Sequence, residues 1–194
     1  MDLRAELLRR RDLDQEPMRK MVGRVVDQDQ RDRLDATIRE NTEWLRGVIR
    51  EQGWPRRSQV GEEGADAAWL LAQHADHDPA FQRECLNLLE MAVAEGEAGK
   101  RNLAHLTDRV SVAERGTQVY GTQLTGGKGG LSPPPIEDPE GVNQRRSEMG
   151  LGSLGAYQKL MLPVMVLAGA RVLATLAWRR VGTIASILRR PRPR

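Results

Sequence analysis

The sequence is poor in cysteine and in aromatic residues. Its 194 residues include one cysteine, Cys85, which excludes an intrachain disulfide framework and any cysteine-based zinc site. Aromatic residues make up 4% of the chain. This argues against a β-sandwich or barrel, because strands favour aromatic and β-branched side chains. With 39% apolar and 29% charged residues, the chain can still form one domain of ordinary size with its own core.

Acidic residues are absent from the end of the chain. No Asp or Glu follows Glu148, and eight Lys or Arg residues lie between Gln158 and the last position. Residues 1–157 therefore carry 22 basic against 27 acidic side chains, a net charge of −5. Because the positive charge is concentrated in the tail and does not cover a folded face, specific nucleic-acid binding is not expected.

This change in charge divides the sequence into a helical domain at 1–157 and a basic, apolar C-terminal tail at 158–194. Five polar side chains of the tail fall on one narrow stripe of a helix: Arg171, Thr175, Arg179, Ser186 and Arg190. We predict a basic amphipathic helix that lies on an anionic membrane surface through 160–194. Two alternatives stay open. The apolar part packs on the body, or it spans the membrane, for which the free energy of insertion is close to zero.

The N-terminus alternates charged residues with leucines and has no apolar signal segment. We therefore expect a cytoplasmic location, with the tail at the inner face of the membrane. The sequence indicates neither a cofactor nor an oligomeric state.

Hydrophobic periodicity in the body predicts a mainly α fold of about six helices. The clearest stripe consists of Leu34, Ile38, Leu45, Val48 and Ile49. Two helices start at an Asp-Pro pair, which supplies an N-cap and a proline at the first helical position. The predicted helices cover 2–26 (divided at Pro17), 32–52, 65–76, a segment from Asp78-Pro79, 98–107, and Asp138-Pro139 to near Gly150.

A small β-hairpin is predicted near 109–123. Val110 and Val112 alternate with polar residues, the run ERG at 114–116 is typical of a turn, and an extended stretch follows it. The Gly- and Pro-rich stretch 124–137 is predicted to be a loop.

The densest polar cluster is QHADHD at 73–78, between two predicted helices. We predict His74 and Asp76 as catalytic residues, because a neighbouring carboxylate fixes the tautomer of an imidazole and makes it a better base. A buried structural histidine is the alternative. A metal site that adds His77 and His105 is a further one, but no strong metal-binding motif is present, so no metal is predicted.

Other polar residues lie where they can face the same pocket. Asn41 interrupts the apolar stripe of the predicted helix at 32–52, where a buried amide must find a hydrogen-bond partner. The other residues lie in or beside the predicted hairpin, or precede Gly150. Arg, Tyr and Gln side chains donate to anionic or carbonyl groups, although each position also has a structural alternative. The predicted ligand-binding residues of this kind are Asn41, Asp108, Arg109, Tyr120, Gln123, Arg145 and Arg146.

Seven short motifs occur in a characteristic order: GWP (53–55), VG (60–61), AAWLLAQHADHDPAFQ (67–82), LTDRV (106–110), QVYGTQ (118–123), PPIEDPEGVNQRR (134–146) and GLGSLGAY (150–157). Over residues 3–160 the chain resembles a family of small bacterial, mainly actinobacterial, proteins that is a domain of unknown function. The resemblance implies no activity. It implies that Gln82 also belongs to the ligand-binding set, since Gln82 shares the family pattern with most of the residues above.

Together these features predict a polar pocket where the corner at 73–82 meets the segment 108–123. His74 is expected to act as acid or base, oriented by Asp76, while Arg109 helps to hold a polar or anionic group. The predicted function is hydrolysis or group transfer on a small metabolite. The alternative is a non-catalytic interaction module that its tail attaches to a membrane, with the polar cluster as a buried hydrogen-bond network.

Overall fold

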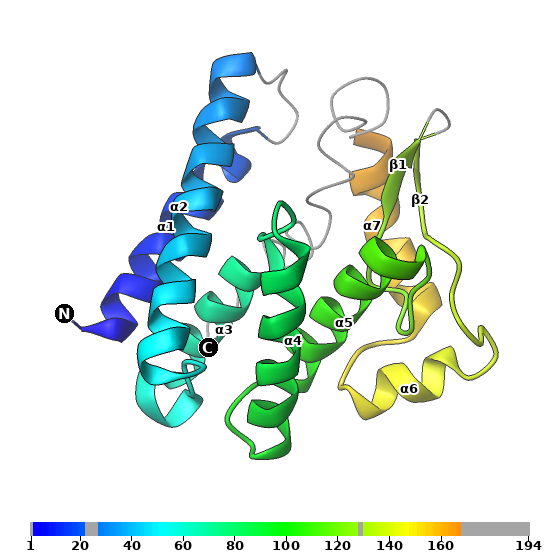
Figure 1. The fold of residues 1–194 in the computed structure, drawn as a ribbon. Coiled ribbons are helices and arrows are strands. Elements are labelled where there is room, and N and C mark those ends of the chain that lie inside the picture. Colours follow the sequence, from blue (N-terminus) through cyan, green and yellow to red (C-terminus); the bar gives the residue numbers. More distant parts are fainter. Residues whose placement is uncertain (1, 22–26, 128–129, 168–194) are drawn as a thin grey trace, which may run out of the picture.

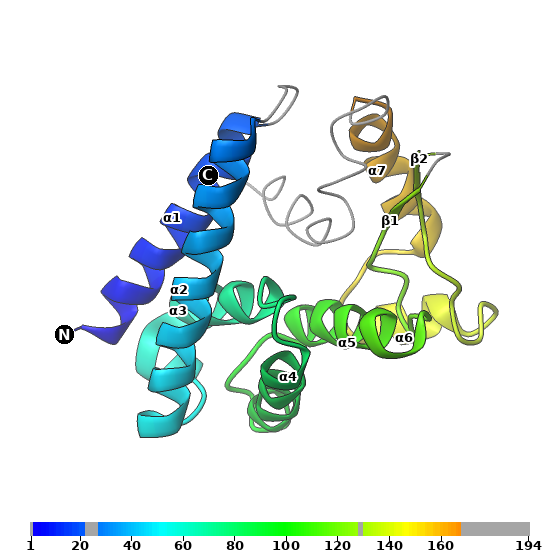
Figure 2. The same ribbon diagram turned by 45° about the horizontal axis from the view of Figure 1, so that its top comes forward.

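The computed structural model describes residues 2–21, 27–127 and 130–167, and this part of the chain is mainly helical, as predicted. Helices α1 and α2 lie at one side, α6, α7 and a short strand pair lie at the other, and α3, α4 and α5 lie between them (Figures 1 and 2). The elements are α1 (Leu3–Met21), α2 (Gln28–Gln52), α3 (Arg57–Gln73), α4 (Pro79–Ala94), α5 (Lys100–Arg115), β1 (Thr125–Gly127), β2 (Gly130–Ser132), α6 (Val142–Glu148) and α7 (Leu154–Leu167).

Helix α3 is the centre of the packing, since it contacts α1, α2, α4 and α5. Its small side chains allow this close approach: Ala67, Ala68 and Ala72 are fully buried. The stripe predicted on α2 is buried as expected. The start of α4 is also confirmed, because Asp78 accepts a hydrogen bond from the Phe81 N–H as N-cap and a proline follows it.

Helix α1 continues through Pro17 to Met21, so the division predicted at this proline is not found, and the rest of the predicted helix, 22–26, lies outside the described residues. A proline removes one helical hydrogen bond and bends a helix, but it does not end a helix that packing holds. Contacts with α2 and α3 hold α1 in this way.

The hairpin predicted near 109–123 is not found there, because α5 remains helical to Arg115 and ends at Gly116 in the left-handed conformation, with φ 72°. Leu106 and Val110 are both buried and one turn apart, so Val110 continues a helical stripe that a short window cannot tell from alternation. An antiparallel strand pair occurs later, where β1 and β2 join within the predicted loop.

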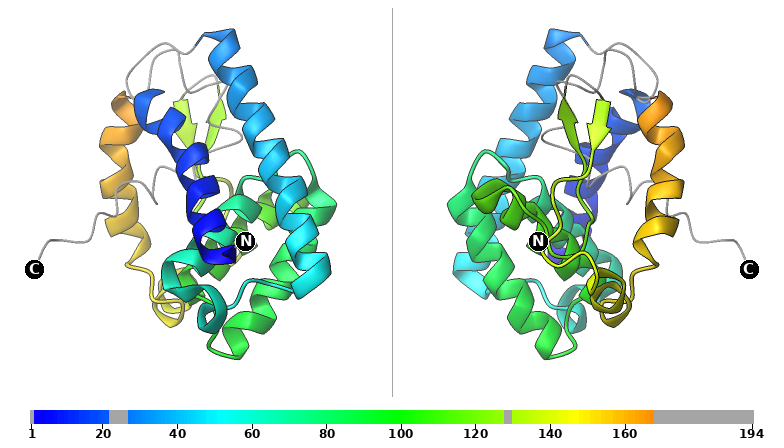
Figure 3. Two further views of the ribbon diagram at one scale, coloured as in Figure 1. Left: turned by 90° about the vertical axis from the view of Figure 1, so that its left-hand side faces the viewer. Right: turned by 90° about the vertical axis from the view of Figure 1, so that its right-hand side faces the viewer.

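Helix α6 starts four residues after Asp138, which itself has a positive φ of 48°. Helix α7 runs across the predicted boundary between 157 and 158, and the rest of the predicted tail helix lies outside the described residues. Strands β1 and β2 and helices α6 and α7 share the side that faces the viewer on the right of Figure 3. No helix in the described ranges is long and apolar enough to cross a membrane.

Candidate functional site

The corner between α3 and α4, residues 74–78, sends polar side chains in two directions. His74, which ends α3, pairs with α1, whereas Asp76 pairs with α5. The predicted site is therefore divided between two groups of contacts.

His74 forms a buried pair with Asp14 of α1. Its Nδ1 lies 2.9 Å from one carboxylate oxygen of Asp14 and 2.8 Å from the other, and the two residues are 4% and 0% exposed. Gln15 donates a further hydrogen bond of 2.7 Å to the same carboxylate. A carboxylate beside Nδ1 favours the tautomer of the neutral imidazole whose ring proton is on Nδ1, which leaves the lone pair on Nε2.

The expectation that Asp76 orients His74 is wrong, since Asp14 takes that place. Sequence reasoning missed Asp14 because it lies sixty positions before the histidine and looks like an ordinary charge on a charged helix. One signal was present: Asp14 lies seven residues after Leu7, on the face of the helix that carries this apolar side chain.

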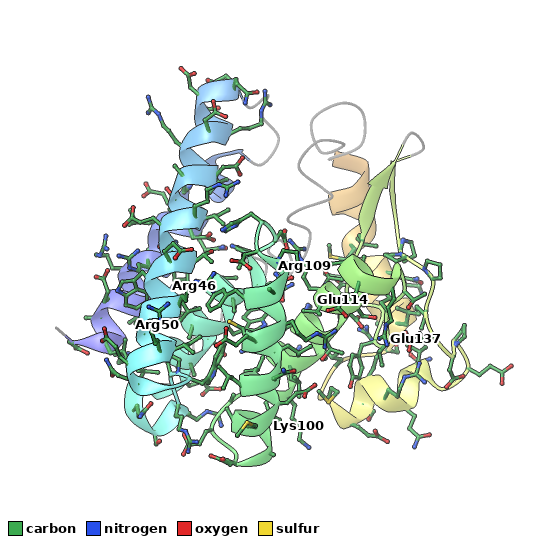
Figure 4. All side chains as sticks on the ribbon, viewed as in Figure 1. Arg46, Arg50, Lys100, Arg109, Glu114 and Glu137 are labelled. Carbon is green, nitrogen blue, oxygen red and sulfur yellow. The ribbon has the colours of Figure 1, made fainter. Side chains whose placement is uncertain are left out.

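Asp76 is bound by Arg109 in a two-pronged ion pair. Arg109 Nε donates to one carboxylate oxygen at 2.8 Å and Nη2 to the other at 2.5 Å, as the guanidinium reaches from α5 toward the corner (Figure 4). Its Nη1 donates to Gln123 Oε1 at 3.2 Å, and Gln82 Nε2 donates to Asp76 at 3.3 Å. The predicted segments do meet here, but their polar groups bind one another.

Asp108 holds the backbone of the segment that follows α5. Its fully buried carboxylate accepts hydrogen bonds from the N–H groups of Val119, Tyr120 and Thr122 and from the Thr122 hydroxyl, at 2.7 to 2.9 Å. Burial raises the pKa of Asp108, and these hydrogen bonds oppose the rise. Asp108 is therefore a backbone anchor in this structure.

Arg145 and Arg146 bind carbonyl groups of the same segment from α6. Arg145 donates to Val119 O at 3.1 and 3.2 Å and to Asp138, while Arg146 donates to Tyr120 O at 2.6 Å and to Gly152 O. Burial lowers the pKa of Arg146. Arg145 and Arg146, like Arg109, thus have donors engaged in intramolecular contacts.

Two predicted ligand-binding residues are less fully engaged. Tyr120 is half-buried, and burial raises its pKa, with a further contribution from Asp108. Asn41 is 2% exposed; its Oδ1 accepts a hydrogen bond of 3.0 Å from Arg10, and within the described ranges its Nδ2 has no partner. Arg10 lies one turn before Asp14, so α1 supplies partners to both Asn41 and His74.

The three histidines are not brought together, and the described part of the chain holds no group of three His, Cys, Asp or Glu side chains that suits a metal. His105 instead contacts Trp69 edge-on, with ring centroids 6.0 Å apart. Burial, with a contribution from Arg39, lowers the pKa of His77. Burial also raises the pKa of the Cys85 thiol, which makes it a poor nucleophile.

Residues 1–168, most of the chain, match one protein family. The chain belongs to DUF6624, a family of unknown function. This confirms the expected membership in a family of unknown function, and the match extends eleven residues into the predicted tail, to residue 168. No curated protein and no solved structure matches this member of DUF6624, so the site is interpreted from its own geometry.

Proposed function

We propose that the protein acts on a small polar metabolite beside α1 and that His74 is the acid or base of a hydrolytic or group-transfer reaction. The observation that carries this proposal is the contact between His74 Nδ1 and the buried carboxylate of Asp14, which comes from a different helix. A carboxylate in this position holds the ring in one orientation and tautomer and stabilises the imidazolium that forms when Nε2 takes a proton.

The neighbouring polar groups support the same location. Arg10 and Asn41 lie one turn along α1 and across from it on α2, and both are buried. Arg10 is also stacked on Trp44, with its guanidinium carbon 4.6 Å from the ring centroid. A guanidinium and an amide next to an acid–base pair are groups that orient a polar or anionic substrate.

The test compares His74→Gln with His77→Gln, the same substitution three residues further along the chain. Purified full-length proteins are incubated with a small-molecule extract of bacterial cells, and consumed compounds are followed by mass spectrometry. We expect a compound that the wild type and His77→Gln consume and that His74→Gln consumes at least about a hundredfold more slowly. Glutamine keeps a donor for Asp14, so circular dichroism is expected to show a folded variant.

Two results would contradict the proposal. One is an extract that the wild type leaves unchanged, and the other is a compound that the wild type and His74→Gln consume at the same rate. Asp14→Asn is the second variant: it keeps the size of the side chain but removes the charge that orients the ring, so its rate is expected to fall as well.

A second candidate function is a non-catalytic interaction module that its C-terminal tail attaches to a membrane. The closed network of Asp76, Gln82, Arg109 and Gln123 favours it, because side chains that bind one another are typical of a structural role. The basic stripe of the tail supplies the attraction to anionic lipid.

Truncation after Leu167 tests this candidate by sedimentation with vesicles. The full chain is expected to sediment with phosphatidylglycerol vesicles, less so as salt is added, and to stay in solution with phosphatidylcholine vesicles. The truncated protein is expected to stay in solution with both. If the truncated protein sediments as the full chain does, the tail is not the anchor.

A further inference from the structure

One face of α3 carries buried polar atoms that lack hydrogen-bond partners among the described residues. Gln73 is 0% exposed, and within the described ranges neither its Nε2 nor its Oε1 has a partner. Within the same ranges, Nε1 of Trp69 also has no hydrogen-bond partner, and Trp69 is 6% exposed. Residues 69 and 73 are one turn apart on the same face of the helix. Buried polar groups in folded proteins are nearly always paired with protein or with a bound molecule.

The neighbouring contacts place Gln73 between α3 and α5. Trp69 contacts His105 of α5, and Asp76 pairs with Arg109, one turn further along α5. Gln73 is one turn after Trp69 on α3, so its side chain shares the face of α3 that packs against α5.

The nearby glutamines do not satisfy this amide. Gln82 Nε2 donates to the backbone oxygens of Ala72 and Gln73, and Gln123 Nε2 donates to the backbone oxygen of His105. The side-chain NH₂ groups of Gln82 and Gln123 thus bind other partners and not the Gln73 amide.

We infer that a small uncharged polar molecule binds between α3 and α5, where it accepts hydrogen bonds from Trp69 Nε1 and Gln73 Nε2 and donates one to Gln73 Oε1. The chemistry is that of a primary amide, a carboxylic acid or an internal water molecule, each of which donates and accepts. An ion does not suit the site, because the charge of Arg109 is already neutralised by Asp76 and burial of a further charge is costly. The inference does not depend on the proposed function of His74.

The variant Gln73→Leu tests whether a guest is bound. If a guest is held, leucine removes two of its hydrogen bonds, and we expect the unfolding equilibrium constant in urea to rise about fivefold or more. If no guest is held, leucine replaces an unsatisfied amide with an apolar group of similar size, and the protein becomes more stable or stays as it was. Either of the last two results would overturn the inference.

Measurements on the wild-type chain identify the guest and do not depend on how the variant folds. An organic guest gives a non-covalent mass adduct in native mass spectrometry, whereas an internal water gives a slowly exchanging component in ¹⁷O relaxation dispersion. Either signal supports the inference and names the source, and the absence of both from the wild type would overturn it. We expect the signal to be lost in Gln73→Leu.

The variant Trp69→Phe removes the indole N–H that donates to the guest, and Trp54→Phe is its matched control. The Nε1 atom of Trp54 is also buried and, in the part of the chain that the structure describes, unpartnered, but Trp54 lies in the turn between α2 and α3. We expect the guest signal to weaken in Trp69→Phe and to persist in Trp54→Phe. Loss of the signal in both variants to the same degree would contradict the location of the guest.

Discussion

At the residue scale, the polar side chains predicted to form the site divide by what they bind. Asp108, Arg145 and Arg146 bind backbone groups of the segment after α5, and Asp76 and Arg109 bind each other. His74 differs, because its partner is a carboxylate on a helix remote in sequence. A sequence pattern shows that these residues are polar and spaced for a site, but it does not show whether each one binds a ligand or a neighbouring residue.

Asp108→Asn is predicted to destabilise the fold. An amide has one acceptor oxygen in place of two, and its NH₂ group would face donors that now bind a carboxylate. We expect a loss of about 3 kcal/mol in the free energy of unfolding, as measured by urea denaturation. Asp138→Asn is the control, since Asp138 also accepts a backbone N–H but its side chain is 63% exposed; its loss is expected to stay below about 1 kcal/mol. Equal losses in the two variants would contradict the anchoring role of Asp108.

At the element scale, the helices with strong signals were predictable and the segment between α5 and α6 was not. The cap of Asp78 and the stripe on α2 are local features, and both are confirmed. The segment 117–123 forms no regular element, because side chains from α5, α6 and α7 bind its backbone; Tyr157, for example, donates to Thr122 O at 2.8 Å. Local periodicity does not contain such long-range contacts.

Gly121→Ala tests how tightly this segment is held. Gly121 has a φ of 68°, and a Cβ there would lie 2.7 Å from Leu154 Cδ1 and 3.0 Å from Ile136 Cδ1. Gly116 has nearly the same φ, 72°, with nothing within 4 Å of its Cβ position, so Gly116→Ala measures the backbone cost alone. We expect Gly121→Ala to lower the unfolding free energy by at least about 1 kcal/mol more than Gly116→Ala. Equal losses would mean that α7 and Ile136 do not pack on this glycine.

At the scale of the whole molecule, α1 links the core to the candidate site. It packs on α3 through Leu7 and presents Arg10 and Asp14, which are also buried, to α2 and to the α3–α4 corner. The sequence indicated His74 and the meeting of 73–82 with 108–123. It did not indicate that α1 completes the pair, since contacts between distant elements depend on how the helices dock.

The central claim is that Asp14, and not Asp76, sets the state of the His74 imidazole. Long-range ¹H–¹⁵N spectra of the labelled protein at neutral pH report which ring nitrogen carries the proton. We predict a proton on Nδ1 of His74 in the wild type, a loss of this preference in Asp14→Asn, and no change in Arg109→Lys. A proton on Nε2 in the wild type, or a tautomer that responds to Arg109 and not to Asp14, would contradict the account.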